Sequence, residues 1–235
     1  MQNILSGVRR AVDECGMISR GDMIAVGVSA GKDSLTALAA LKALSAFYPE
    51  PFELFALTLD MDADQNTDYS PLREFCGGLG VPFHLKYTDI RRIVFDIRKE
   101  SNPCSLCAKL RRGILNDAAK ALGANKVALG HHMDDFVETF FLNLFYEGRI
   151  GTFKPVTYLD RTDLTVIRPM IFTPEKTIAA YAREAGLPVI KSSCPANGHT
   201  KRQFAKEYVR ELSHRLGNPN FREQVLGALR RGGMI

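Results

Sequence analysis

The chain has 235 residues, of which 46% are hydrophobic and 24% are charged, a composition typical of globular proteins rather than disordered or fibrous ones. It contains no apolar run near the roughly 20 residues that span a bilayer, and its N-terminal segment becomes charged too early for a signal peptide. We therefore expect a cytoplasmic protein with no membrane partner. The formal charge of +5 and the pI near 9.0 fit a basic enzyme and a nucleic-acid partner equally well.

Short apolar runs alternate with amphipathic segments through the first two thirds of the chain. The sequence predicts strands over residues 23–29, 52–59, 83–88 and 126–130. It predicts helices over residues 34–47, 70–80, 104–123 and 134–148. This alternation indicates an α/β fold in which helices cover both faces of a parallel twisted sheet.

The pattern changes after Gly148. Residues 153–170 are predicted to form two extended pieces around a polar turn. Residues 173–186 are predicted to form a helix with Thr173 as its cap and Pro174 at its first position. Two basic amphipathic helices follow, in residues 198–217 and 218–231. We therefore expect an α/β domain over residues 1–190, carrying the cysteine helix described below, and a small helical C-terminal extension over residues 191–235, unless the two form one domain.

The segment VSAGKDSL joins the first expected strand to the first expected helix. It does not have the Walker A spacing, because Gly27 lies one residue too close to Gly31 and Asp33 follows the lysine. Small residues at a strand end, followed by the N–H groups of a helix N-terminus, nevertheless form an anion site. A carboxylate in such a site can hold the Mg²⁺ that bridges phosphates. Asp33 is therefore a candidate magnesium ligand, and the alternative is a simple helix cap.

A second polar segment, GHHMDD over residues 130–135, ends the fourth expected strand and opens a helix. Open parallel sheets bind their ligands at this edge. Its histidines and aspartates could bind a metal or ATP phosphates, or perform acid–base chemistry. The structural alternative is that His131 is a buried hydrogen-bonded histidine and Asp134 a helix cap.

Five cysteines in a cytoplasmic chain do not indicate a disulfide framework, because that compartment keeps thiols reduced. Cys104 and Cys107 form a C-x-x-C pair, which could be a redox couple, half of a zinc site or part of an iron–sulfur site. Cys194 and His199 could complete a zinc site. An iron–sulfur cluster could instead use the pair with Cys194 and leave one iron open.

Two of these segments resemble those of one superfamily, the PP-loop ATP pyrophosphatases, which split ATP into AMP and pyrophosphate while adenylating a substrate. SAGKDS is similar to the superfamily's S-G-G-x-D-S signature, with Ala30 in place of its first glycine, and GHHMDD is similar to its G-H-x-x-D-D segment. The resemblance implies ATP as a cofactor, with its pyrophosphate end at the first segment. The candidate nucleotide-binding residues are Ser29, Ala30, Gly31, Lys32, Asp33, Ser34, Asp60, Gly130, His131 and Asp135.

The run CSLCAKLRRGIL, with LGHH, FLNLFYEG and a later cysteine before a basic helix, resembles the tRNA 2-thiocytidine synthetase family over nearly the whole chain. This resemblance implies that the C2 oxygen of cytidine 32 in tRNA is adenylated and then replaced by sulfur. It also implies a 4Fe-4S cluster on Cys104, Cys107 and Cys194. Asp33 would hold Mg²⁺, and Asp134 or Asp135 would position the metal or a base. The stretch SSCPANGH departs from the C-x-x-C that is commoner in this family beside the third ligand.

Basic residues near the cysteine pair and along the tail favour tRNA as a partner, although a solvated face explains them as well. They are Lys109, Arg111, Arg112, Lys201, Arg202, Lys206 and Arg210. Phe153, Tyr158 and Phe204 could stack on an extruded base or pack in the core. The reaction also needs a sulfur donor, such as a cysteine desulfurase. The apolar helix over 134–148 fits either a homodimer contact or core burial.

Two other functions fit parts of the sequence. An amide-forming adenylating ligase of the same fold would use the ATP segments and would need no cluster. A zinc-stabilised RNA-binding module would use the cysteines and the basic tail, with an ATP site that no longer reacts. The Asp33 carboxylate argues against this last function, because a binding module needs no metal ligand in an anion loop.

Overall fold

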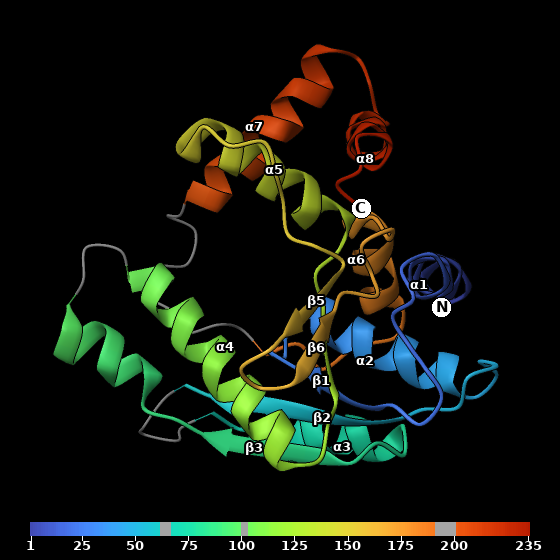
Figure 1. The fold of residues 1–235 in the computed structure, drawn as a ribbon, viewed down its shortest axis with the longest axis vertical. Coiled ribbons are helices and arrows are strands. Elements are labelled where there is room, and N and C mark those ends of the chain that lie inside the picture. The colour runs from blue at the N-terminus through green and yellow to red at the C-terminus, as the bar shows by residue number, and fades with distance from the viewer. Residues whose placement is uncertain (62–66, 100–102, 191–200) are drawn as a thin grey trace.

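The structure is a computed structural model that describes residues 1–61, 67–99, 103–190 and 201–235 (Figure 1). Its strands are β1 (Met23–Gly27), β2 (Glu53–Asp60), β3 (Phe83–Tyr87), β4 (Lys126–Leu129), β5 (Val156–Leu159) and β6 (Leu164–Ile167). Its helices are α1 (Gln2–Glu14), α2 (Lys32–Ser45), α3 (Ser70–Gly78), the π-helix η1 (Arg92–Arg98), α4 (Pro103–Ala121), α5 (Met133–Glu147), α6 (Glu175–Glu184), α7 (Lys201–Arg215) and α8 (Phe221–Arg231). No helix in the described part of the chain is both long and apolar enough to cross a bilayer.

The described strands form one sheet in the order β3-β2-β1-β4-β6-β5. All neighbouring pairs are parallel except β5 and β6, which form an antiparallel hairpin at the edge. From β1 the chain continues to β2 on one side, and β4 lies on the other side of β1. The strand order therefore reverses between β1 and β4, and the carboxyl ends of these two strands form the crevice where such sheets bind ligands.

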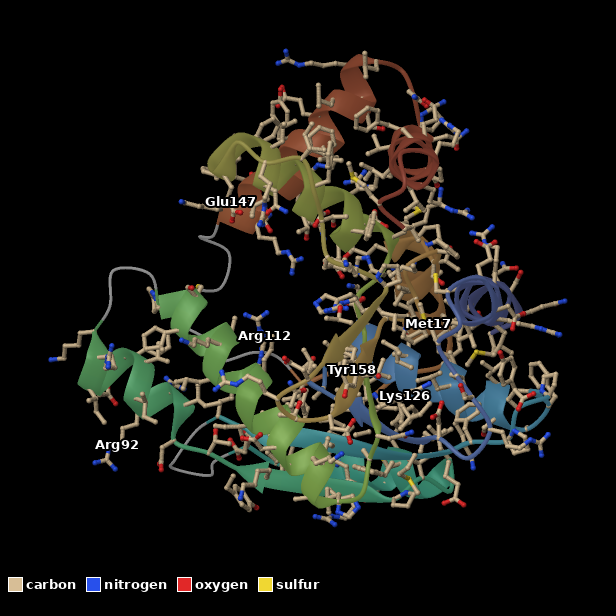
Figure 2. The ribbon with its side chains drawn as sticks, viewed as in Figure 1. Met17, Arg92, Arg112, Lys126, Glu147 and Tyr158 are labelled. Carbon is tan, nitrogen blue, oxygen red and sulfur yellow. The ribbon has the colours of Figure 1, made fainter. Side chains whose placement is uncertain are left out.

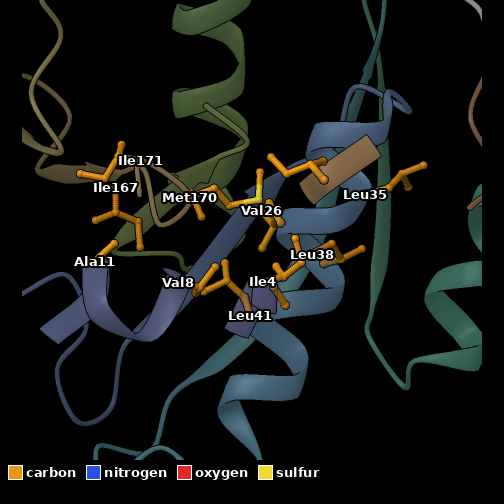
Figure 3. Close-up of a cluster of buried hydrophobic side chains, with 14 of the residues drawn as sticks. Ile4, Val8, Ala11, Val26, Leu35, Leu38, Leu41, Ile167, Met170 and Ile171 are labelled. Carbon is orange, nitrogen blue, oxygen red and sulfur yellow. The ribbon is translucent and has the colours of Figure 1, made fainter. Parts of the chain in front are cut away.

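The two faces of the sheet are covered by different helices, and alternate residues of a strand serve different faces. Val26 of β1 belongs to a large apolar cluster with α1, α2, α5 and α6, whereas Ala25 packs on the other face against Leu115 and Ala119 of α4. Figure 3 shows part of the larger cluster, with labelled members Ile4, Val8, Ala11, Val26, Leu35, Leu38, Leu41, Ile167, Met170 and Ile171. The expected α/β fold with helices on both faces is confirmed, with one antiparallel edge strand.

Helices α7 and α8 lie over α5 rather than over the sheet (Figure 1). Their buried side chains Val209, Leu226 and Leu229 belong to the same apolar cluster that holds α1 and α2. The tail is therefore packed through α5 onto the α/β core. The division at residue 190 stays a prediction.

The structure differs from the sequence-based expectation in three places. Helices α1 and η1 have no counterpart among the predicted elements. The prediction for the start of α6 is wrong by one residue, because Pro174 is the N-cap and Glu175 the first helical residue. The Thr173 hydroxyl is buried and has no hydrogen-bond partner, so it does not cap the helix. As described below, Asp134 of α5 provides the acceptor instead.

Candidate active site

The segment between β1 and α2 forms a tight turn whose backbone enters the helix at Lys32. Ser34 Oγ accepts a hydrogen bond from the Ser29 amide at 3.1 Å and donates one to the Gly31 carbonyl at 3.0 Å. Ala30 is buried and has a φ of +56°, a left-handed conformation that glycine adopts without strain. The turn thus holds the first amides of α2 at the carboxyl end of β1, which is the arrangement of an anion site.

Gly130, at the end of β4, lies directly against this turn. A Cβ atom at position 130 would come within 2.9 Å of the Ser34 amide nitrogen and 3.0 Å of the Asp33 carbonyl carbon. Real Cβ atoms do not approach backbone that closely. Glycine is therefore required at position 130 so that the two predicted ATP-binding segments can meet.

A chain of alternating charges runs from the turn to the C-terminal helices. Lys32 Nζ lies 2.9 Å from Asp33 Oδ1 and 3.0 Å from Glu175 Oε1 of α6. Lys206 Nζ of α7 reaches the same Glu175 carboxylate at 2.8 Å. Burial alone would raise the pKa of Glu175, but hydrogen bonds from Lys206 and Lys32 outweigh it and lower that pKa to about 2. Glu175 is therefore a carboxylate at neutral pH, and it links the turn to α7.

Asp134 connects α5 to two other helices. Its Oδ2 accepts a hydrogen bond from the Glu175 amide at 2.7 Å, so it caps α6 rather than α5. Its Oδ1 lies 2.9 Å from Nε of Arg222 in α8, an ion pair without hydrogen-bond geometry. These contacts match the structural alternative for Asp134, a helix cap, with a partner that lies 41 residues away in the chain.

His132 and Asp135 form a capping box at the start of α5. His132 Nδ1 accepts from the Asp135 amide, and Asp135 Oδ2 accepts from the His132 amide. His132 Nε2 then lies 3.7 Å from Asp33 Oδ1 across the crevice. Burial opposes ionisation of Asp135, but His132 and Arg202 outweigh it and lower the pKa of this carboxyl. Asp135 Oδ2 also lies 3.5 Å from the same Nε2 atom of His132, so Asp33 and Asp135 both lie close to one imidazole nitrogen.

His131 and Glu138 are two titratable groups of this region that each have one buried atom without a hydrogen bond, although Glu138 Oε1 lies 3.9 Å from Nη2 of Arg222. The Nδ1 atom of His131 is buried without a hydrogen-bond partner, and so is Oε1 of Glu138. Burial lowers the pKa of His131 to about 4 and raises the pKa of Glu138 to about 7. The structural alternative for His131, a hydrogen-bonded histidine, is therefore not supported at Nδ1. At neutral pH His131 is an uncharged imidazole.

Asp60 and the aromatic candidates lie at separate places. Asp60 is buried at the carboxyl end of β2, next to the strand that leads into the turn. The Phe153 ring is covered by Arg168 at 5.1 Å and packs against His131, so it contributes to packing. Tyr158 is 62% exposed on β5, and Phe204 is 50% exposed on α7, so both side chains can be reached from solvent.

The cysteine pair opens α4. Cys104 is exposed and Cys107 half-buried, one helical turn further along. In a β-α-β crossover the helix begins at the carboxyl edge of the sheet, and α4 connects β3 to β4 by this route. Leu115 of the same helix packs near Gly27 at the end of β1. The cysteine pair precedes Leu115 by roughly 12–16 Å along the helix axis. The pair therefore lies on the same edge as the turn. Cys194 and His199 lie outside the described residues.

Sequence reasoning missed three partners in this region. Glu175 and Arg222 were not among its candidates, and Lys206 was considered only as a basic residue of the tail. Each is an ordinary charged residue of an amphipathic helix. No local pattern distinguishes them, because their role depends on where α6, α7 and α8 dock.

The chain resembles known proteins over most of its length. A family model described as PP-loop domain matches residues 5–213. The tRNA-cytidine(32) 2-sulfurtransferase of Pelobacter propionicus is 40% identical over 225 residues, covering 94% of this chain and 82% of that protein. The enzyme of the same name from Geobacter sulfurreducens is 41% identical, covering 97% of this chain and 89% of that protein.

One solved structure has a closely similar fold. The U34-tRNA thiolase NcsA from Methanococcus maripaludis, solved with its 4Fe-4S cluster, gives a TM-score of 0.79 at 22% identity. The match covers 97% of this chain and 78% of that one. At this identity the likeness establishes the fold.

Proposed function

The chain belongs to the PP-loop domain family and, within it, to the tRNA-cytidine(32) 2-sulfurtransferases, and we propose that it replaces the C2 oxygen of cytidine 32 in tRNA with sulfur. The C2 oxygen attacks the α-phosphorus of ATP and pyrophosphate leaves. Sulfur at the oxidation level of sulfide then attacks C2 as hydrosulfide, AMP departs with the oxygen, and the sulfur loses its proton. Adenylation is needed because the carbonyl oxygen is otherwise a poor leaving group.

The observation that carries this proposal is the position of two thiols and one anion-binding turn on the same edge of the sheet. The turn at Ser29–Ser34 follows β1, and Cys104 and Cys107 open α4, the helix that comes after η1 and leads into β4. An adenylating ligase would need the turn alone, and an RNA-binding module would need neither the turn nor Asp33. A sulfurtransferase that activates its substrate with ATP needs both.

We assign the phosphates of ATP to the turn. The first amides of α2 would donate to the pyrophosphate end, where the helix dipole also favours negative charge. Lys32 would move from Asp33 and Glu175 toward a phosphate oxygen. Asp33 would then be released to a cation.

Magnesium fits this site by the chemistry of its donors. Mg²⁺ in nucleotide enzymes takes one or two carboxylates together with phosphate oxygens, and no group of three or more His, Cys, Asp or Glu in the described part of the chain could hold an ion without such help. Asp33 would hold it, and the chemistry that Mg²⁺ supplies is neutralisation of phosphate charge. Asp135, whose Oδ2 lies near the same Nε2 atom of His132 as Asp33 Oδ1, is the second carboxylate beside the crevice.

An iron–sulfur cluster fits the start of α4 by the same kind of test. Cys104 and Cys107 present two thiols one turn apart on an accessible helix end, as thiolate ligands of such a cluster require. We propose Cys194 as the third ligand. The chemistry that the cluster supplies is delivery of sulfur, and a donor such as a cysteine desulfurase would provide the sulfur itself.

The surface formed by α5 and α7 is suited to RNA. Phe204 stacks on Tyr208 at 6.0 Å, and Lys201 Nζ lies 4.8 Å from the Tyr146 ring. Exposed aromatic rings beside cations are what single-stranded bases and phosphates contact. The same apolar surface could instead join two copies of the chain. With tRNA as substrate, we expect the protein to act in the cytoplasm.

The test is the formation of 2-thiocytidine in unmodified tRNA under anoxic conditions, together with iron and acid-labile sulfide content. Cys104→Ala should lose sulfur transfer and most of its iron. Cys15→Ala is the matched control, because Cys15 lies at the end of α1 and packs against the core. Iron that is retained in Cys104→Ala would refute the cluster assignment.

Pyrophosphate release, zinc content and RNA binding, measured on the same proteins, separate the other two functions. Pyrophosphate release that survives in Cys104→Ala at the wild-type rate, with no thiolation by either protein, would indicate a ligase. Tight zinc and RNA binding without pyrophosphate release would indicate a binding module.

A further inference from the structure

Arg168 follows β6 and has its charge incompletely satisfied. One terminal nitrogen donates to the Lys154 carbonyl at 2.6 Å and to Thr157 Oγ1 at 3.4 Å, and the guanidinium covers the Phe153 ring. Nε is buried and has no hydrogen-bond partner. Arg168 as a residue is half-buried, and a partly desolvated cation without a counter-ion costs folding free energy. An anionic ligand would supply the missing charge.

Arg112 of α4 adds a second positive charge to the same place. The pKa of the Arg168 guanidinium is lowered to about 10, mainly by burial and secondly by the positive charge of Arg112. Arg112 is therefore close enough to repel Arg168. Its own Nε donates only to the Ala108 carbonyl of its helix. In Figure 2 Arg112 projects from α4 toward the middle of the molecule, whereas Arg92 lies at the periphery. Among the described residues, neither Arg112 nor Arg168 forms an ion pair.

No carboxylate of the described residues compensates these two charges. The imidazole of His131 is within electrostatic range of Arg168 and Arg202 and of one carboxylate, Asp135. That carboxylate is already engaged by Arg202 at 3.7 Å and by the capping box. Two like charges therefore lie within electrostatic range of each other, one on α4 and one after β6, and neither has a carboxylate partner in the described part of the chain.

We propose that Arg112 and Arg168 form a phosphate-binding site for the backbone of the RNA substrate, at the nucleotide to be modified or next to it. The proposal rests on the proposed function, which makes tRNA the substrate. Guanidinium groups bind phosphate oxygens through paired N–H donors. The cation–π contact with Phe153 fixes the plane of the Arg168 guanidinium before the substrate arrives.

The position favours an RNA phosphate over a phosphate of ATP. The turn after β1 already offers amides and Lys32 to the ATP phosphates, whereas Arg168 follows β6, on the far side of β4 from that turn. Arg112 lies on α4 between the cysteine pair and Leu115, the residue that packs near the end of β1. A phosphate held there would place its nucleotide between the sulfur-delivering and the adenylating parts of the site.

The experiment measures binding of unmodified tRNA without ATP over a series of salt concentrations, and ATP binding in parallel. We expect Arg112→Gln and Arg168→Gln each to weaken tRNA binding roughly tenfold at low salt. Each should also reduce the slope of the logarithm of the binding constant against the logarithm of salt concentration by about one. Arg92→Gln, which removes the same charge from an exposed position on η1, should bind like wild type. ATP affinity should stay within about twofold of wild type in all three variants.

Arg112 is exposed, so Arg112→Gln should fold even if Arg168→Gln does not. Arg168→Lys keeps the positive charge but loses the paired N–H donors of the guanidinium. Weaker ATP binding with unchanged tRNA binding would overturn the proposal and assign the arginines to ATP. Unchanged binding of both would overturn it as well. Arginine-dependent tRNA binding by a wild-type protein that forms no 2-thiocytidine would support the phosphate site and refute the proposed function.

Discussion

The two ends of the parallel sheet treat buried charge in opposite ways. At the amino end of β1 and β4, Lys126 Nζ lies 2.7 Å from Asp22 Oδ2; Asp22 is buried and the Lys126 side chain is 12% exposed. The second oxygen of Asp22 accepts from Asn125, and Lys126 also donates to the Met17 carbonyl. Met17 and Lys126 are labelled in Figure 2. The protein itself completes this polar network.

At the carboxyl end the corresponding groups are left incomplete. His131 Nδ1, Glu138 Oε1 and Arg168 Nε are buried without hydrogen-bond partners. Unsatisfied groups of this kind cost stability, and they gather where substrates supply the missing partners. The comparison teaches that the amino end stabilises the fold, whereas the carboxyl end accepts a stability cost in order to bind ligands.

The largest effect should come from breaking the completed network. Lys126→Met leaves Asp22 buried without its cation, which costs about 3–5 kcal/mol, and denaturant unfolding would measure it. Asp22→Asn in the same chain should recover most of the loss. ATP affinity should not change, because the pair lies at the opposite end of the sheet. A parallel loss of ATP affinity would show that the two ends are coupled.

Neutralising the Glu138 carboxylate, at the carboxyl end of the sheet, should raise the free energy of unfolding rather than lower it. Burial raises the pKa of Glu138 to about 7, above its unfolded value near 4.5, so the folded protein binds the extra proton between these values. Wild-type stability from this group is therefore full below about pH 4.5 and is lost as the pH rises through 7. At pH 8, Glu138→Gln should be about 3 kcal/mol more stable than wild type. The advantage should vanish near pH 4.5, and an equal difference at both pH values would contradict this assignment.

A smaller effect is expected where the two ATP-binding segments meet. Gly130→Ala would place a methyl group against the Asp33–Ser34 backbone, at a cost of about 2 kcal/mol, and the displaced turn should bind ATP more weakly. Gly77→Ala is the control, because Gly77 is an exposed residue of α3 with open space around it. That variant should gain up to about 1 kcal/mol. Normal ATP binding by Gly130→Ala would show that the turn tolerates displacement.

The smallest effect is expected at Ala30. Its left-handed backbone costs about 1–2 kcal/mol, and Ala30→Gly relieves this cost while losing a buried methyl group and adding chain entropy. The variant should stay within about 0.5 kcal/mol of wild type in thermal unfolding. Ala40→Gly, at a buried helical position of α2, should lose about 2 kcal/mol. Equal losses at both positions would mean that the φ of +56° carries no strain.

Local patterns in the sequence predicted much of the fold. Alternation of apolar runs with amphipathic segments indicated the parallel sheet, since burial on both faces makes strands continuously apolar. The turn at Ser29–Ser34 and the segment opening with Gly130 were placed correctly at strand ends, because small residues mark such turns. Helix α1 was missed, because a charged N-terminal segment was considered only as a targeting signal.

The sequence by itself determined which residues follow each strand, and so which chemical groups share the carboxyl edge of the sheet. Only the tertiary structure decided their partners. Asp134 caps α6 instead of its own helix, and Glu175 links Lys32 to α7. Arg168 lies within electrostatic range of Arg112, and neither has a carboxylate partner among the described residues. The physical reason is range. Helical and strand periodicity is encoded within a few residues, whereas a charge–charge contact depends on how helices that are distant in the chain dock.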